Sequence, residues 1–314
     1  MDTPVETIEP QSWLDRPVFK SLPQFKIENL IIVIILVLAI FSRFYILGER
    51  VMSHDEVNHV IPSFDIFEGR QYRHDPITHG PFQFHIIALS YFLLGDSDFS
   101  ARVPAALFSI ATIVLVLFGF RKYLGRTGSL IAGFLFLISP YMLFYGRYTR
   151  NESFVALYGV ATLFAVLKYL HDGKISSLYI LGIATAMHFI TKETNYIYAA
   201  QLLIFLAFLF MERITRARWP HEKARTTFLV SLSSALIILL MTLGVAAWNA
   251  IANRAVTPAT PVTEAAGEVV QTLSWIKVVE GSGIVIAVAL LVLAAYLLLR
   301  YIGWKALKQE RSFD

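Results

Sequence analysis

The sequence predicts an all-α, polytopic membrane protein with about eight transmembrane helices and short juxtamembrane helices in the first outer loop. Apolar residues make up 56% of the 314 residues and charged residues only 16%, whereas soluble proteins carry more charge. Several apolar runs approach or exceed the length needed to cross a bilayer. Lys and Arg gather in the short segments between these runs, as they do in cytoplasmic loops.

The composition also excludes several classes of function. The chain has no cysteine, which excludes disulfides, zinc–thiolate sites and thiol nucleophiles. The net charge of +4 comes with basic residues that cluster in short loops between apolar runs, so it does not suggest nucleic-acid binding. The first apolar run is not followed by a small-residue cleavage site, so no cleavable signal peptide is expected.

The polar segment at residues 1–28 is expected to be a cytoplasmic tail, followed by a transmembrane module over 29–302 and a second cytoplasmic tail over 303–314. The first span covers about residues 29–47. Arg16, Lys20 and Lys26 precede it and place its start inside.

The first outer loop, residues 48–100, contains an apolar segment, 81–94, that is too short to span. Its fourteen residues would cover roughly 21 Å of helix, less than the roughly 30 Å of a bilayer core. If it spanned, the basic loop at Arg121, Lys122 and Arg126 would lie outside. We therefore predict a juxtamembrane or re-entrant helix.

The remaining spans alternate so that every basic loop lies inside, including the most basic one from Arg213 to Arg225. Both termini are then cytoplasmic, and residues 250–275 form a last outer loop. The expected spans after the first cover about residues 101–120, 128–145, 153–170, 176–190, 195–211, 227–249 and 280–300.

This orientation places three polar clusters from separate loops on the outer side. They are His54, Asp55, Glu56 and His59 after the first span, then Arg147, Arg150 and Glu152, and then Lys192 and Glu193. Charged groups at membrane depth are expensive and usually face a cavity or one another. Three clusters at one level therefore indicate a site.

Each cluster also has a purely structural interpretation. Asp55 and Glu56 would favour the N-terminus of the helix that begins after Ser53. The arginines with Glu152 could be an interfacial ion-pair set, and Lys192 with Glu193 a loop ion pair. We expect His54 and His59 to be hydrogen-bonded walls of a site rather than metal ligands.

Together the clusters suit transfer of a group from a lipid phosphate to an acceptor. A carboxylate pair could activate an acceptor hydroxyl or amine as general base. Asp55, Glu56 and Glu152 could instead hold a divalent cation, Mg²⁺ or Mn²⁺, which prefers oxygen ligands. Basic residues nearby could neutralise a phosphate leaving group.

The chain resembles the C-superfamily of membrane glycosyltransferases, in the branch of the protein O-mannosyltransferases and aminoarabinose transferases. The matching motifs follow one another over about residues 30–200 and are closest to the flippase-activity-associated prokaryotic subgroup. They are Asp55-Glu56; His79-Gly80-Pro81-Phe82; Gly95-Asp96-Ser97-Asp98-Phe99 with Arg102-Val103-Pro104-Ala105-Ala106-Leu107-Phe108; Ser139-Pro140; Arg147 to Glu152; and Lys192-Glu193-Thr194.

This resemblance implies a polyprenyl-phosphate-linked sugar donor, inverting transfer and an extracytoplasmic site in the prokaryotic cell (inner) membrane. It implies that Asp55 is the base or acceptor-orienting carboxylate, that Glu56 assists it, and that Glu152 is the second acidic residue. The acceptor would be a protein, lipid or glycan. Candidates for binding substrate or donor phosphate are Arg147, Arg150, Lys192, His79 and His54.

Two departures from the family pattern leave alternatives open. Gly80 replaces the first proline of the family's His-Pro-Pro motif, and the sequence stops after roughly eight expected spans. The sequence thus favours a glycosyltransferase but also allows a non-catalytic subunit of a larger membrane complex. A lipid flippase is disfavoured, because few polar residues fall at mid-depth of the spans.

Overall fold

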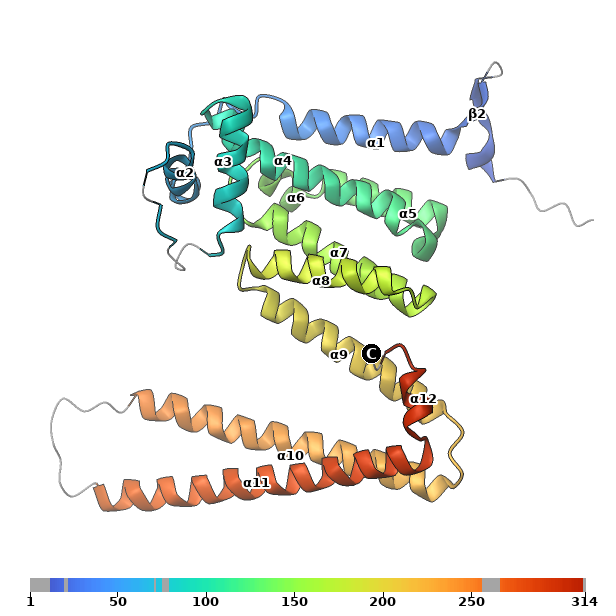
Figure 1. Cartoon of the computed structure of the whole chain (residues 1–314), viewed down its shortest axis with the longest axis vertical. Coiled ribbons are helices and arrows are strands. Elements are labelled where there is room, and N and C mark those ends of the chain that lie inside the picture. Colours follow the sequence, from blue (N-terminus) through green and yellow to red (C-terminus); the bar gives the residue numbers. More distant parts are fainter. Residues whose placement is uncertain (1–11, 20–21, 71, 75–78, 256–265, 313–314) are drawn as a thin grey trace, which may run out of the picture. The chain divides into compact units, whose positions relative to one another are not determined.

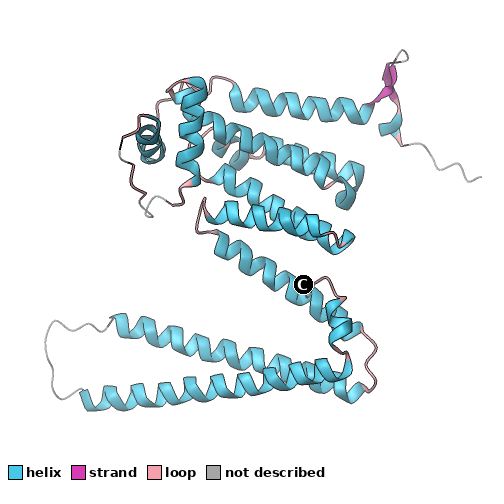
Figure 2. Cartoon of the chain, viewed as in Figure 1, coloured by secondary structure: helices cyan, strands magenta, loops and turns pink. Residues whose placement is uncertain are grey.

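The computed structural model describes residues 12–19, 22–70, 72–74, 79–255 and 266–312 and is almost entirely helical there (Figures 1 and 2). The chain folds as two compact units, Met1–Ile204 and Phe205–Asp314. In the described part of the chain, six helices are long and apolar enough to cross a membrane, which confirms the all-α polytopic class. They are Ile27–Phe44, Asp98–Gly119, Glu152–Asp172, Asn195–Arg216, Glu222–Asn249 and Gly281–Tyr301.

The first unit is a bundle of helices with two further helices across one end. The bundle contains α1 (Ile27–Phe44), α4 (Asp98–Val114), which continues into the π-helical segment η3 (Leu115–Gly119), α5 (Arg121–Ile138), α6 (Pro140–Tyr145), α7 (Glu152–Asp172), α8 (Ile175–Phe189) and the start of α9 (Asn195–Arg216). In Figure 1, α2 (His54–Phe67) and α3 (Phe82–Leu94) run crosswise to α1 and α4. The short outer helix expected at 81–94 is therefore present and does not run with the bundle.

The third expected span, 128–145, consists of two helices with a break between them. Helix α5 ends at Ile138, and α6 begins at Pro140. Ser139 has extended backbone angles (φ −55°, ψ 122°), because the ring of a following proline disfavours the helical conformation. The fifth expected span corresponds to α8, whose fifteen residues cover about 22 Å.

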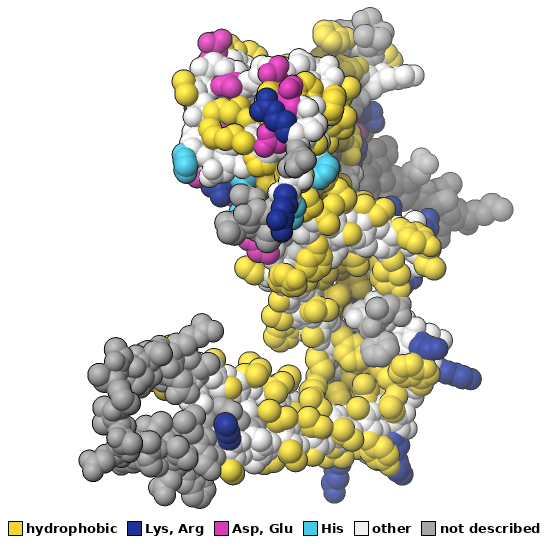
Figure 3. All heavy atoms as spheres, turned by 60° about the vertical axis from the view of Figure 1, so that its left-hand side comes forward, with side chains coloured by type: hydrophobic (Ala, Val, Ile, Leu, Met, Phe, Trp, Pro, Cys, Tyr) yellow, Lys and Arg dark blue, Asp and Glu magenta, His cyan; other side chains and the backbone are white. Residues whose placement is uncertain are grey.

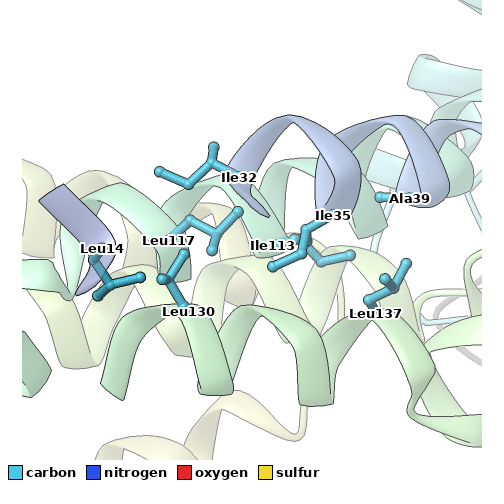
Figure 4. Packing of buried hydrophobic residues seen from close by; sticks show 8 residues of the cluster. All are labelled: Leu14, Ile32, Ile35, Ala39, Ile113, Leu117, Leu130 and Leu137. Atoms are coloured by element: carbon cyan, nitrogen blue, oxygen red, sulfur yellow. The ribbon is translucent and has the colours of Figure 1, made fainter. Parts of the chain in front are cut away.

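The core of the first unit lies between α1, α4 and α5 (Figure 4). Ile35 and Ala39 of α1 face Ile113 of α4 and Leu137 of α5, and all four are buried. Each fully buried aliphatic side chain contributes about 1.5–3 kcal/mol. This packing holds the ends of these helices in register.

Residues 12–19 and 22–26, within the expected N-terminal tail, are folded against α1. They form η1 (Trp13–Asp15) and an antiparallel pair of strands, β1 (Pro17–Phe19) and β2 (Leu22–Lys26). Leu14 joins the core cluster and is only 2% exposed.

The second unit pairs two long helices, α10 (Glu222–Ala255) and α11 (Ala266–Tyr301). Both continue into the expected outer loop 250–275, of which residues 256–265 lie outside the described part of the chain. Helix α12 (Trp304–Lys308) follows, and its Leu307 is buried against Ile214, Phe228 and Ala294. The expected C-terminal tail is therefore partly helical and packed.

Candidate functional site

The three polar clusters come together at one end of the first unit. This loop end consists of α2, α3, residues 147–152 and residues 190–194. The helices place it there: α1, α5 and α8 end on this side, whereas α4, α7 and α9 begin on it (Figure 1). Figure 3 shows charged and histidine side chains gathered over this end, above a largely hydrophobic surface.

Asp55 and Glu56 point in different directions, because consecutive helical residues are about 100° apart. Ser53 caps α2 through a capping box with Glu56, so both carboxylates lie in the first helical turn. Glu56 is completely buried, whereas the Asp55 side chain is 53% exposed. The two adjacent carboxylates therefore have separate roles.

Glu56 anchors three segments of the chain. Its Oε1 accepts hydrogen bonds from Arg102 Nε (2.8 Å) and the Thr149 backbone N–H (3.2 Å). Its Oε2 accepts from Arg102 Nη2 (3.1 Å), Arg50 Nη2 (2.8 Å) and the Ser53 backbone N–H (3.1 Å). Burial alone would raise the pKa of Glu56, but these hydrogen bonds outweigh it and the pKa is lowered.

This arrangement makes Glu56 a positioning residue rather than an available base. A carboxylate with no exposed surface and five donors has no free oxygen for an acceptor hydroxyl or a metal. Arg102 completes the anchor by donating from Nη1 to the carbonyls of Leu47 (3.0 Å) and Arg50 (2.8 Å). Arg102 belongs to the family motif Arg102-Val103-Pro104, but the motif alone does not indicate this role.

Asp55 belongs instead to a chain of alternating charges. Arg150 Nη1 donates to Asp55 Oδ2 at 2.7 Å, and Arg150 Nε lies 3.7 Å from Glu152 Oε2. Lys192 Nζ donates to Glu152 Oε1 at 3.0 Å. Two carboxylates and two cations thus form a network without net charge. They come from the three loops that the sequence places on one side of the membrane.

His79 is brought to this end by a close approach of two loops. Gly80 N–H donates to the Thr191 carbonyl (3.1 Å) and Phe82 N–H to the Ile190 carbonyl (3.1 Å). A Cβ at Gly80 would overlap the Ile190 carbonyl, so glycine is required at this departure from the family motif. His79 itself has φ +73°, which is uncommon for a residue with a side chain.

His79 forms an ion-pair contact that the sequence did not predict. Its Nδ1 lies 2.9 Å from Glu193 Oε1. The pKa of Glu193 is lowered by its own backbone N–H and by the hydrogen bond with His79. His54 is exposed at the first position of α2, so its predicted part in phosphate binding stays a prediction.

His59 is a buried member of the loop end. It is 5% exposed, stacks on His79 (ring centroids 6.4 Å apart) and on Phe84 (5.9 Å), and its Nδ1 has no hydrogen-bond partner. Burial lowers the pKa of His59 to about 4, and the charge of Arg150 acts in the same direction. His59 is therefore neutral at physiological pH.

Arg147 does not join Arg150 and Lys192, although the three were predicted together as phosphate-binding candidates. Its guanidinium donates to the carbonyls of Ser42 (3.2 Å) and Tyr45 (2.7 Å). It therefore caps the C-terminal end of α1, where carbonyl groups lack helical partners.

Hydrogen-bonding atoms without partners concentrate at the loop end. Ten residues of the described part of the chain carry buried side-chain polar atoms without a hydrogen bond. Six belong to this end: His59, Gln83, Arg150, Asn151, Glu152 and Thr194. Two more, His188 and Asn195, flank residues 190–194 in the sequence. Because buried polar atoms are normally paired, these groups need water or a polar ligand.

The carboxylates do not fit the divalent-cation site considered from the sequence. Among the described residues, no group of three His, Cys, Asp or Glu side chains is placed to hold a metal ion. Both oxygens of Glu56 are occupied, and one oxygen of Glu152 faces Lys192. We therefore derive no step through a metal ion.

The apolar helices and the carboxylate–arginine network among their loops define a polytopic membrane protein with a polar site at one end. The profile of the dolichyl-phosphate-mannose-protein mannosyltransferase family matches residues 78–248, more than half of the chain. The chain belongs to this family. The match includes His79, Arg102, Arg150, Glu152 and Lys192, whereas Asp55 and Glu56 precede it. A comparison with curated proteins finds no match.

Proposed function

We propose that this membrane glycosyltransferase of the mannosyltransferase kind moves a sugar from a polyprenyl-phosphate donor to an extracytoplasmic acceptor, with inversion at the anomeric carbon. The observation that carries the proposal is the Asp55–Arg150 pair at 2.7 Å. It places an exposed carboxylate base beside a cation suited to a phosphate group.

In the proposed reaction, Asp55 takes the proton of the acceptor hydroxyl while that oxygen attacks the anomeric carbon. The bond between the anomeric carbon and the phosphate oxygen breaks, and its electron pair leaves with the polyprenyl phosphate. Attack from the face opposite the phosphate inverts the anomeric configuration. Arg150 and Lys192 stabilise the charge on the departing phosphate, and Glu152 holds both cations between the loops.

The remaining residues position these groups. Glu56 and Arg102 fix the first turn of α2, and with it Asp55, against α4 and Thr149. His79, held by Glu193, and His54 supply further ring N–H groups for the phosphate. The unpartnered side-chain amides of Gln83, Asn151 and Asn195 provide hydrogen bonds for sugar hydroxyls.

The orientation of the loop end rests on charge. The opposite end of the first unit carries Lys26, Arg121, Lys122 and Arg126, which the positive-inside rule assigns to the cytoplasm. The loop end then faces the extracytoplasmic side, where a protein, lipid or glycan acceptor would reach it. Other membrane subunits are compatible with this placement.

The test is transfer of labelled mannose from polyprenyl-phosphate mannose in membranes that contain the protein, followed in protein, lipid and glycan fractions. Asp55→Asn should abolish transfer while the protein remains folded, and Asp65→Asn, later in the same helix, should retain it. If Asp55→Asn transfers at the wild-type rate, the proposed base is wrong. Complete absence of transfer with stable co-purification of other subunits would favour the scaffold alternative.

A further inference from the structure

A second cationic feature lies beside the network of Asp55 but is separate from it. Near the end of α1 is a cavity of about 180 Å³, which we call the three-arginine cavity. The residues that line it are Leu47, Arg50, Arg102, Leu143, Phe144 and Arg147. Its volume is about six times the roughly 30 Å³ that a water molecule occupies, so it can admit a phosphate group with a few waters.

The cavity lining carries excess positive charge. Three guanidinium groups line it. Among the described residues, Glu56, which contacts Arg50 and Arg102, is the one carboxylate bonded to them. The network around Asp55, by contrast, balances two cations with two carboxylates. An anionic group such as a phosphate would balance this excess charge through charge-assisted hydrogen bonds, so the cavity favours an anion.

Contacts within the protein fix the positions of the three guanidinium groups before an anion binds. Arg102 is buried and fixed by Glu56 and two backbone carbonyls, and Arg147 is fixed by the end of α1. Arg50 contacts Glu56 through one Nη and lies over the rings of Tyr148 (5.0 Å) and Phe144 (5.9 Å). A planar guanidinium with free N–H groups is well suited to bidentate contact with phosphate.

Arg147 and Arg150 come from one short loop, but Arg147 lines the cavity and Arg150 belongs to the network of Asp55. Arg150 contacts Asp55 and Glu152, whereas Arg147 turns to the carbonyls of Ser42 and Tyr45 and lines the cavity. The cavity therefore lies on the side of Glu56 that faces α1, and Asp55 is not among its lining residues.

Apolar and aromatic side chains surround the three-arginine cavity, as expected for a site that binds a lipid. Leu47, Leu143 and Phe144 form the apolar part of the lining. Tyr45, Ile46, Tyr141 and Phe144 around the end of α1 are each more than half exposed. Aromatic side chains at this level are typical of the membrane interface, where lipid headgroups lie.

We propose that the three-arginine cavity binds the phosphate headgroup of an anionic bilayer phospholipid, with the acyl chains along the exposed apolar surface at the end of α1. This site goes beyond the transfer reaction and does not depend on it. Such a lipid would tie α1 to α6 and to the loop that carries Arg150.

The test uses the full chain in nanodiscs of phosphatidylcholine, with or without phosphatidylglycerol. We expect phosphatidylglycerol to raise the Tm of the wild type by several degrees, since a ligand that binds only the folded state stabilises it. Arg50→Gln with Arg147→Gln should lose this shift. Arg70→Gln, which removes an exposed arginine of the same outer loop, should keep it.

A second variant protects the test against loss of folding. Leu143→Trp fills the cavity without removing charge, and it should abolish the shift with little change of Tm in phosphatidylcholine alone. An equal phosphatidylglycerol shift in wild type, double variant and Leu143→Trp would overturn the proposal. An equal shift from inorganic phosphate in phosphatidylcholine would overturn the lipid as its source.

A titration with polyprenyl phosphate distinguishes the three-arginine cavity from the proposed donor site. Added to phosphatidylcholine nanodiscs, polyprenyl phosphate should stabilise the wild type and the double variant equally, because Arg150 and Lys192 remain. Loss of that stabilisation in the double variant would make the cavity the donor-phosphate site and overturn a separate lipid site. Failure to stabilise even the wild type would count against the proposed donor, while the phosphatidylglycerol result still decides the cavity.

Discussion

The two ends of the first unit both carry ion networks, but they treat their polar groups differently. At the basic end, formed by Asp15, Lys26, Glu28, Arg121 and Arg126, the charged groups lie in direct contact. Arg126 donates to Asp15 and Glu28, Arg121 pairs with Glu28 at 2.6 Å, and Lys26 pairs with Asp15 at 2.9 Å. At the loop end, charged pairs are mixed with buried polar atoms that have no partner. The contacts at the basic end therefore stabilise the fold. The unpaired atoms at the loop end remain able to form hydrogen bonds with a ligand.

The largest loss of stability is expected from a substitution in the Glu56–Arg102 ion pair, which fixes the first turn of α2. Arg102→Met leaves Glu56 buried without its principal partner, and removing one member of a buried ion pair typically costs about 3–5 kcal/mol. Thermal unfolding in detergent should show a large decrease of Tm, and transfer should be lost with it. Arg70→Met, at an exposed pair, is the control; equal effects would show that Glu56–Arg102 is not an anchor.

The next largest effect is a dependence of the protein's stability on pH, caused by His59. Its pKa is about 4 in the folded protein and about 6.5 when unfolded. The unfolded chain therefore binds more protons between these values, so stability is full above pH 6.5 and falls as the pH drops toward 4. The full difference is on the order of 3 kcal/mol. His59→Asn should flatten the Tm profile between pH 7 and 4.5; an unchanged profile would contradict the assignment.

At the basic end, Glu28→Gln should reduce stability without reducing transfer per folded molecule. Glu28 is 4% exposed and contacts two arginines, and charged hydrogen bonds of this kind contribute about 1.5–3 kcal/mol. Unfolding and transfer should be measured on the same preparation. Loss of transfer in the folded fraction would break the distinction between the two ends.

A smaller effect is expected at the close approach of the two loops. Gly80→Ala forces a Cβ against the Ile190 carbonyl and should cost about 1–3 kcal/mol as overpacking does. It should also lower transfer, since His79 shifts away from Glu193. Gly182→Ala has open space around it and should be neutral or stabilising. Similar results for both variants would show that Gly80 is not constrained.

The sequence predicted the helical class and the meeting of Asp55, Arg150, Glu152 and Lys192, because apolar runs and basic loops place helix ends on a common side. It could not give side-chain direction. The separation of Asp55 from Glu56, and of Arg147 from Arg150, depends on helical phase and on partners far along the chain. Pro140 indicates a helix break at Ser139, but the apolar residues on both sides of it favoured a single continuous span.

The most direct test of the loop end is a cryo-EM map of the protein bound to polyprenyl-phosphate mannose, with Asp55→Asn to prevent turnover. We expect the donor phosphate between Arg150 and Lys192, the sugar ring beside residue 55, and sugar hydroxyls at the unpartnered amides of Asn151 and Gln83. Donor density at the basic end, or a loop end still without ligand at saturating donor, would contradict it.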